Sequence, residues 1–372
     1  MLNRRQVPFF NYPALFKSQE SELLAAVRDV LSRGAYILQQ DLREFEHSLA
    51  KYLNVKHAFG LADGTNAIIL ALRAAGVGAG DEVIVPSHTF IASVYPIKSL
   101  GATPVLVECA DDHLVDPAAV ESAVTKRTRA ILPVHLNGRT CNMAAIEKLA
   151  GRRGLAIVED AAQALGSKFM GRFAGTFGLA GTFSFYPAKS LGCFGDGGAL
   201  VTNDDKVAER IELWRDHGRN KEGVVVDWGT NCRLDNLQAA VLNVKLRSLD
   251  AAIARRREIA REYERRLRPI RDLMLPPGPD AGGEHFDTFQ NYEMQANRRD
   301  ELRAYLEQHG VRTLLQWGGR AVHQFEALGF DVSLPKTELM TSRFIMLPMN
   351  TSLADDDVRY ICDVIEQFYS RG

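Results

Sequence analysis

Short apolar runs alternate with helical segments through the middle of this chain, and this alternation restricts the fold more than any other feature. The apolar runs lie at 83–85, 105–107, 130–134, 155–158, 182–185 and 199–201. The helical segments between several of them are Thr65–Ala75, Ala92–Leu100, Pro117–Val124 and Met143–Ala150. Continuous apolar strands separated by helices are typical of a mostly parallel sheet covered by helices. The sequence therefore predicts an α/β fold, whose ligands gather at the carboxyl ends of the strands.

The chain on either side of this alternation has a different pattern. Two amphipathic helices are predicted before it, over Ser21–Ser32 and Asp41–Tyr52. Beyond it, a single long helix is predicted over Asp235–Arg268, followed by a proline-rich breaker. A chain of 372 residues exceeds one typical core. We therefore predict a large domain over 1–248 and a smaller C-terminal α+β domain over 249–372.

Composition excludes several classes of function. The net charge of -1 gives no bulk attraction to nucleic acid or to anionic membranes. The five cysteines are odd in number and show no metal-ligand spacing, so we expect neither disulfides nor a metal site. No apolar run is long enough to span a bilayer. We expect a soluble, cytoplasmic protein.

An acidic residue and a lysine each follow one of the apolar runs. Asp160 ends the run that begins at Leu155, and Lys189 follows the stretch 181–187. A lysine can form an imine with the aldehyde of pyridoxal phosphate (PLP), and a carboxylate can keep the ring nitrogen of PLP protonated. Two plainer interpretations stay open: Asp160 as the cap of a following helix, and Lys189 as a solvated loop residue. The pair together favours an enzyme that uses PLP.

Two glycine-containing segments could approach a phosphate. Asp63-Gly64-Thr65 lies between a predicted strand and a helix, where backbone amides and a hydroxyl can bind an anion. An ordinary strand-to-helix turn capped by Asp63 or Thr65 would leave the same pattern. The run 192–198 lacks the ending of a nucleotide-binding P-loop, and it is interpreted as a tight turn that lets backbone approach a ligand.

Taken in order along the chain, these segments resemble the DegT/DnrJ/StrS family of nucleotide-sugar aminotransferases, which have the PLP-dependent fold type I. The matching stretches span about half of the chain: 63–67, 89–92, 133–135, 159–164, 183–189, 195–198 and 229–234. The resemblance implies a mostly parallel central sheet covered by helices, with a smaller C-terminal domain. It also implies PLP as the cofactor.

The resemblance assigns roles around the cofactor ring. By resemblance, Lys189 holds PLP as an imine and moves protons during catalysis. Asp160 would face the pyridine nitrogen. Gln163 would hydrogen-bond the phenolic oxygen of the ring, and Phe90 would stack on its face. One branch of the family has histidine in place of the lysine and dehydrates its sugar, so Lys189 favours transamination.

The resemblance also assigns a phosphate site and a partner. Gly64, Thr65 and Ser184 would hold the phosphate within one subunit, and Asn231 would reach it from the other subunit. The implied assembly is a homodimer with active sites at the subunit interface. The stretch 314–319 departs from the usual tyrosine-proline pattern of the family, which leaves the substrate less well specified than the cofactor.

The resemblance implies transfer of an amino group from L-glutamate to a nucleotide-linked keto-deoxysugar. The favoured acceptor is a dTDP-4-keto-6-deoxyhexose, aminated at C4, with C3 of a 3-keto isomer as the alternative. Two other classes stay open. One is a PLP-binding regulator without turnover, against which the lack of a DNA-binding module counts. The other is a nucleotide-binding protein without PLP, which the lack of a GxGxxG motif disfavours.

Four other conspicuous side chains receive weaker predictions. His135 follows an apolar run, and a structural hydrogen bond is the favoured role. His217 is interpreted as a helix-terminal residue. His323 and Trp317 either line the sugar or nucleotide pocket or pack at the surface or at an interface.

Overall fold

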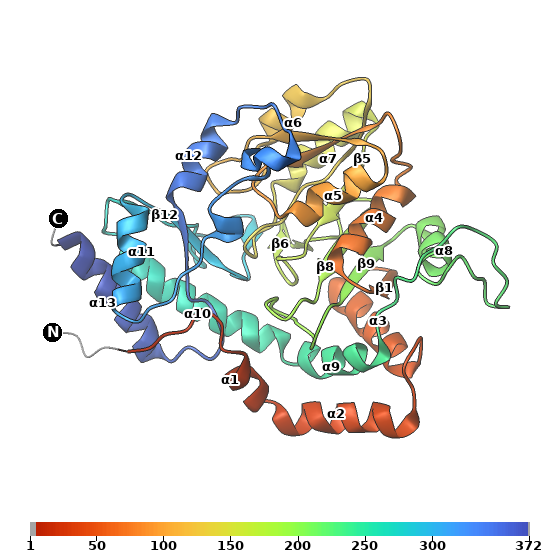
Figure 1. The fold of residues 1–372 in the computed structure, drawn as a ribbon, viewed down its shortest axis with the longest axis horizontal. Helices are drawn as coiled ribbons and strands as arrows, with labels where there is room; N and C mark the ends of the chain where they lie inside the picture. Colours follow the sequence, from red (N-terminus) through yellow and green to blue (C-terminus); the bar gives the residue numbers. More distant parts are fainter. Residues whose placement is uncertain (1–4, 371–372) are drawn as a thin grey trace.

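A seven-stranded sheet forms the centre of the protein (Figure 1). The computed structural model describes residues 5–370. The strand order is β1-β9-β8-β5-β4-β2-β3, and the strands are β1 (His57–Leu61), β2 (Glu82–Pro86), β3 (Thr103–Val107), β4 (Thr128–Ile131), β5 (Ala156–Asp160), β8 (Ala180–Ser184) and β9 (Gly198–Thr202). In this sheet β9 alone runs antiparallel to the other six strands. The predicted mostly parallel α/β sheet is confirmed.

Helices follow the strands as the alternation predicts. They are α4 (Gly64–Ala74), α5 (Ile91–Ser99), α6 (Pro117–Ala123), α7 (Met143–Arg153) and α8 (Asp205–Trp214). Each strand in the middle of the sheet is almost wholly buried, because apolar side chains on both faces pack against helices. The helix α4 lies against β8 and β9, and this contact brings its N-terminus to the end of β8.

Three helices precede the sheet: α1 (Tyr12–Lys17), α2 (Glu20–Arg33) and α3 (Gln40–Leu53). The two predicted N-terminal helices are therefore confirmed. Gly34 ends α2 with φ of 61°, a left-handed conformation that suits glycine. The apolar face of α3 covers the sheet, where the ring of Phe45 meets that of Phe185 at 5.2 Å.

The single helix predicted over Asp235–Arg268 is wrong. Two helices occupy this stretch, α9 (Asn236–Leu246) and α10 (Leu249–Leu267). Ser248 lies between them with φ of -106° and ψ of 7°, outside the helical range. Its hydroxyl donates to the carbonyl of Lys245 and accepts from Gln19. Serine competes in this way for helix backbone groups, so it ends α9 and lets α10 start in a new direction.

The C-terminal part contains helices and a small antiparallel sheet of order β10-β12-β13. Its elements are β10 (Leu273–Met274), β12 (Tyr292–Ala296), α11 (Arg299–Gln308), the short helices η1 (Gln316–Gly318), η2 (Val322–Gln324) and η3 (Glu326–Leu328), α12 (Pro335–Arg343), β13 (Phe344–Leu347) and α13 (Asp355–Ser370). This α+β region has its own buried core. Figure 1 shows it on the left, beside the central sheet.

Two links join the regions on either side of residue 248. A third small sheet pairs β11 (His285–Phe286) with β6 (Lys168–Phe169), which in turn pairs with β7 (Arg172–Phe173). Val7, near the start of the chain, bonds to the backbone of Gly310 and Arg312 and packs in the C-terminal core. The domain limits of 1–248 and 249–372 stay a prediction.

Two further observations concern the chain as a whole. In the part that the structure describes, no helix has both the length and the apolar character needed to cross a membrane. All five cysteines are free and buried: Cys109, Cys141, Cys193, Cys232 and Cys362.

Candidate active site

A cleft of about 570 Å³ lies at the carboxyl ends of the parallel strands. Asp160 ends β5, Ser184 ends β8, and Phe90 follows β2. Seven of the eight residues that the sequence singles out line this cleft: Gly64, Thr65, Phe90, Asp160, Gln163, Ser184 and Lys189. The eighth, Asn231, is exposed and lies outside it. Residues from four parts of the sequence therefore meet where an α/β fold binds its ligand.

The first part of the cleft is the N-terminus of α4. Asp63 caps this helix, because its Oδ1 accepts a hydrogen bond from the amide of Asn66 at 2.8 Å. The first amides of a helix have no partner within the helix, and they attract anions. Gly64 lies so close to Ser184 that an added Cβ would stand 3.1 Å from the Ser184 Cβ. The turn is a capped helix start, and the phosphate site expected at its amides stays a prediction.

Asp160 is almost fully buried at the next strand end, with 5% of its surface exposed. Its Oδ2 accepts a hydrogen bond from Ser93 Oγ at 2.6 Å, and its Oδ1 accepts one from the amide of Ala162 at 3.0 Å. A turn follows rather than a helix, so the cap alternative does not apply. Among residues 5–370, no cation forms an ion pair with Asp160. A buried carboxylate in this state favours a cationic group in the cleft, such as a protonated pyridine nitrogen.

Lys189 lies in the loop after β8 and faces the same cleft as Asp160. Removal from water lowers the pKa of Lys189 to about 8. The negative charge of Asp160 acts in the opposite direction but does not outweigh this effect. A lysine with such a pKa is partly neutral near pH 7, as an amine that attacks a carbonyl must be. The predicted acid and lysine therefore share one site.

Gln163 is held with its amide in a defined orientation. Its Oε1 accepts two hydrogen bonds, from the backbone amide of Asn137 at 2.9 Å and from Asn291 Nδ2 at 3.1 Å. The Nε2 group is left to face Gln316 Oε1, at 3.4 Å, and the cleft. Gln163 thus presents an N–H donor to the cleft, which suits an ionised phenolic oxygen.

Two aromatic residues form a wall of the cleft. Phe90 is 52% exposed at the start of α5, and its ring lies 6.5 Å from that of Trp317 at an interplanar angle of 29°. Trp317 has φ of 49°, a left-handed conformation that is uncommon for a bulky residue. Trp317 therefore lines the cleft, and its contact with a sugar or nucleotide stays a prediction.

The glycine-rich run 192–198 approaches protein backbone. A Cβ on Gly192 would stand 2.7 Å from the carbonyl oxygen of Pro187, and one on Gly198 would stand 2.4 Å from the carbonyl carbon of Asp63. These glycines allow the loop that carries Lys189 and the start of α4 to pack closely. Of this run, Asp196 alone lines the cleft.

The histidines that the sequence singles out lie outside the cleft lining: His135, His217 and His323. His135 is fully buried, and its Nε2 bonds to Glu159 at 2.8 Å while its Nδ1 accepts from the amide of Cys141. The predicted structural role of His135 is confirmed. His217 is exposed and follows the end of α8. His323 is buried and bonds to Ser87 at 2.7 Å.

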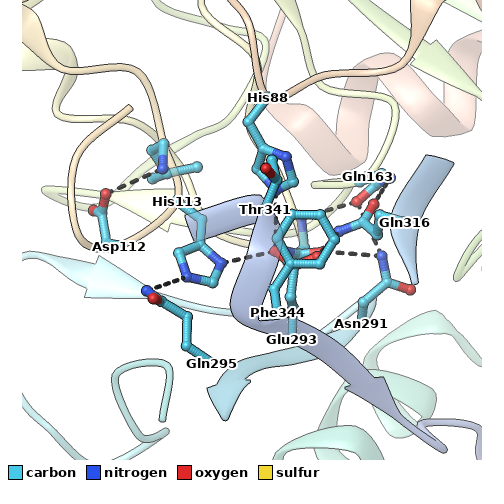
Figure 2. Close-up of polar contacts among 12 residues, drawn as sticks. His88, Asp112, His113, Gln163, Asn291, Glu293, Gln295, Gln316, Thr341 and Phe344 are labelled. Atoms are coloured by element: carbon cyan, nitrogen blue, oxygen red, sulfur yellow. Dashed lines mark hydrogen bonds and ion pairs between the residues drawn. The ribbon is translucent and has the colours of Figure 1, made fainter. Parts of the chain in front are cut away.

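Sequence reasoning missed a set of polar residues behind and beside the cleft. They are His88, His113, Asn137, Gln290, Asn291, Glu293 and Gln316, and Figure 2 labels all of them except Asn137 and Gln290. Gln290, Asn291 and Gln316 line the cleft itself. The only early signal was that the stretch 314–319 departs from the family pattern.

The mostly parallel sheet, with a lysine and an acid at its carboxyl edge, defines the class of fold type I aminotransferases. The chain belongs to the DegT/DnrJ/EryC1/StrS aminotransferase family, whose model matches residues 17–366. It is therefore an enzyme of the aminotransferase type.

Individual relatives match over nearly the whole chain. The dTDP-3-amino-3,4,6-trideoxy-alpha-D-glucose transaminase of Streptomyces venezuelae is 41% identical, over 98% of this chain and 97% of its own. A pleiotropic regulatory protein of Geobacillus stearothermophilus is 38% identical, over 98% of each chain. The crystal structure of S. venezuelae DesV in complex with a ketimine intermediate matches with a TM-score of 0.94 and 41% identity, over 99% of both chains.

Proposed function

We propose that this protein binds PLP and transfers the amino group of L-glutamate to the keto carbon of a nucleotide-linked deoxysugar. The observation that carries this proposal is the shared cleft of Lys189 and Asp160: a lysine of lowered pKa faces a buried carboxylate that forms no ion pair among the described residues. When bound, PLP would supply an electron-accepting ring that stabilises negative charge on the carbon losing its proton. The donor set of the cleft fits each end of this cofactor.

Each residue has a separate task in this proposal. Asp160 holds a proton on the pyridine nitrogen, and Gln163 donates a hydrogen bond to the phenolic oxygen. Gly64, Thr65 and Ser184 bind the phosphate. Together these contacts orient the pyridine ring against Phe90.

Lys189 carries the proton transfers. With PLP bound, its amine would hold the cofactor until the amino acid displaces it. The freed amine would then take the proton from the alpha carbon of glutamate and return it on the cofactor side. Glutamate would leave as 2-oxoglutarate, with its amino group left on the cofactor and its keto oxygen taken from water, and the reverse steps would pass that amino group to the keto sugar and release water.

The proposal includes a homodimer in which Asn231 completes the phosphate site of the other subunit. Asn231 is exposed in the single chain, and it follows a loop with exposed apolar side chains. Val225 is 66% exposed and Trp228 is 87% exposed in that loop. Apolar side chains gathered on an exposed loop favour burial against a partner.

For the acceptor, we propose a dTDP-linked 3-keto sugar aminated at C3. The name of the 41% identical S. venezuelae relative, which is a 3-amino sugar transaminase, supports this choice. Amination at C4 of a dTDP-4-keto-6-deoxyhexose, the acceptor favoured from sequence, is the alternative. Incubation of the PLP-loaded enzyme and glutamate with both keto sugars would decide, since NMR of the product identifies the aminated carbon.

A regulator that binds PLP without turnover is the second candidate, favoured by the name of the G. stearothermophilus relative. Formation of 2-oxoglutarate from glutamate, coupled to loss of the keto sugar over many turnovers, excludes it. Lys189→Ala is the matched control, because it removes the reacting amine. Turnover in that variant at the wild-type rate would overturn the proposed function.

A further inference from the structure

A buried carboxylate behind the cleft accepts hydrogen bonds from four side chains (Figure 2). Glu293 lies on β12 and is 2% exposed. Its Oε1 accepts from His88 Nε2 at 3.1 Å, His113 Nδ1 at 2.7 Å and Asn137 Nδ2 at 3.1 Å. Its Oε2 accepts from Gln316 Nε2 at 2.7 Å. Burial acts to raise the pKa of Glu293, but the two histidines outweigh it and hold this pKa below its usual range.

An ionised carboxylate can only accept hydrogen bonds, so Glu293 dictates how its amide neighbours turn. Asn137 and Gln316 must both direct their NH2 groups toward it. The oxygen of Asn137 then faces away from Glu293, where it accepts from Gln316 Nε2 at 2.7 Å and from Asn291 Nδ2 at 3.0 Å. Asn291 in turn must direct its NH2 group inward.

The orientation of Asn291 decides what the cleft presents. Its Nδ2 also donates to Gln163 Oε1, which leaves the Gln163 Nε2 group toward the cleft. The Asn291 oxygen lies on the opposite side of its amide from this network, as Figure 2 shows, and bonds to none of the described residues. The chain of amides therefore begins at Glu293, which can only accept hydrogen bonds. It ends at the N–H donor of Gln163 and the free carbonyl oxygen of Asn291.

We propose that Glu293 is a positioning residue that fixes the orientation of these amides, so that Gln163 offers an N–H and Asn291 a carbonyl oxygen to the cleft. This inference rests on the proposed function. The N–H faces the phenolic oxygen of PLP. The Asn291 oxygen accepts a hydrogen bond from a donor on the substrate, a hydroxyl or an amino group of the sugar.

A metal ion is the competing explanation for the same residues. The ligand atoms of His88, His113 and Glu293 lie within 4.8 Å of one another, and two histidines with a carboxylate are a known set for zinc. Both Glu293 oxygens, however, already accept hydrogen bonds, three of them on Oε1. A metal would have to break these bonds. The geometry thus favours a hydrogen-bond centre.

The decisive variant is Glu293→Gln, which keeps the shape and adds a donor. If the new oxygen stays with the three donors at Oε1, the new NH2 group meets the NH2 group of Gln316. Gln316 must then turn its oxygen inward and its NH2 group toward Gln163 Nε2, so two donors face each other. Gln163 is displaced from the phenolic oxygen.

The readout is the visible absorbance of PLP bound to Lys189, titrated with pH. The phenolic oxygen also accepts a hydrogen bond from the protonated imine, and a hydrogen bond from Gln163 weakens that contact. Loss of the Gln163 hydrogen bond therefore stabilises the protonated imine and raises the pH midpoint of its titration. We expect Glu293→Gln to raise the midpoint by roughly one pH unit, the size of one hydrogen bond to an ionised oxygen. Glu82→Gln is the matched control, since Glu82 is 4% exposed but lies at the opposite end of β2 from Phe90. Its midpoint should equal that of the wild type.

A second variant keeps the test valid if Glu293→Gln does not fold. Asn291→Asp leaves Glu293 and its histidines intact but removes the Nδ2 donor, and it should raise the midpoint in the same direction. The inference is overturned if the midpoint is unchanged in whichever of Glu293→Gln and Asn291→Asp folds. It is also overturned if the wild-type holoenzyme contains one metal ion per chain. If the wild type itself binds no PLP, the proposed function fails instead.

Discussion

Gln290 accepts two hydrogen bonds from Ser190, the residue directly after Lys189, one from its amide at 2.5 Å and one from its Oγ at 2.7 Å. Its Nε2 also donates to the carbonyl of Ala188 at 2.8 Å. A glutamine from the C-terminal part of the chain thus clamps the backbone on both sides of Lys189. These contacts fix the loop that carries Lys189 against the C-terminal part of the chain.

Gln290→Ala should therefore lower kcat by roughly 10–100-fold, because small displacements of a reacting group are costly. Cofactor binding should weaken far less, since the phosphate site is untouched. Steady-state kinetics and PLP titration would measure the two effects. Gln238→Ala is the control: it removes a similar clamp, on Phe194, outside the cleft lining. Equal losses in both variants would contradict the special role of Gln290.

Asp160→Asn should lower kcat by roughly 10²–10³-fold, as loss of one preorganised electrostatic contact does. The amide keeps the volume but cannot hold a proton on the pyridine nitrogen. Ser93→Ala should have a smaller effect on kcat, because it only frees one oxygen of Asp160. Single-turnover rates with glutamate would rank the variants. A larger loss in Ser93→Ala than in Asp160→Asn would contradict the assigned roles.

The cofactor-free protein should become more stable between about pH 8 and pH 10.5. The folded pKa of Lys189 is about 8 against an ordinary 10.5, so in this window the unfolded chain holds more protons. The free energy of unfolding should rise by ~1–3 kcal/mol across it, less than the full shift implies, because the side chain is partly exposed.

Lys189→Met removes this titration, so the difference between wild type and variant isolates the effect from other groups. Urea unfolding of both proteins at each end of the window gives the measurement. Parallel pH responses would show that Lys189 has an ordinary pKa in the folded chain.

Mixing two inactive variants should restore activity if Asn231 acts across the dimer. In a mixed dimer of Lys189→Ala and Asn231→Ala, one site carries both defects and the other carries neither. Random exchange of equal amounts should therefore revive about a quarter of all sites. Activity after mixing, with each variant alone as control, tests this. No recovery after proven subunit exchange would place Asn231 in the site of its own chain.

The central sheet and most of the cleft could be predicted because their signals are local. Asp160 and Ser184 end apolar strands, and the ends of neighbouring parallel strands meet at one edge. Lys189 could be placed at the same edge of the sheet because it follows β8 in the sequence.

Other features have no local signal. Glu293 stands in a short strand, and its partners His88, His113 and Asn137 lie more than 150 residues away in sequence. Nothing near residue 293 reveals that four donors will converge on it. The break at Ser248 was missed for a different reason, since a serine alone is a weak stop signal within a strongly periodic helix.

The clamp from Gln290 has a consequence for synthesis of the protein on the ribosome. Lys189 emerges long before its clamp, and Gln316 later still, so a nascent chain that has reached α9 carries Lys189 on an unsupported loop. The large sheet can form at that stage, but the proposed pocket for the vitamin B6 coenzyme is finished only when the last third of the chain has been translated and has docked.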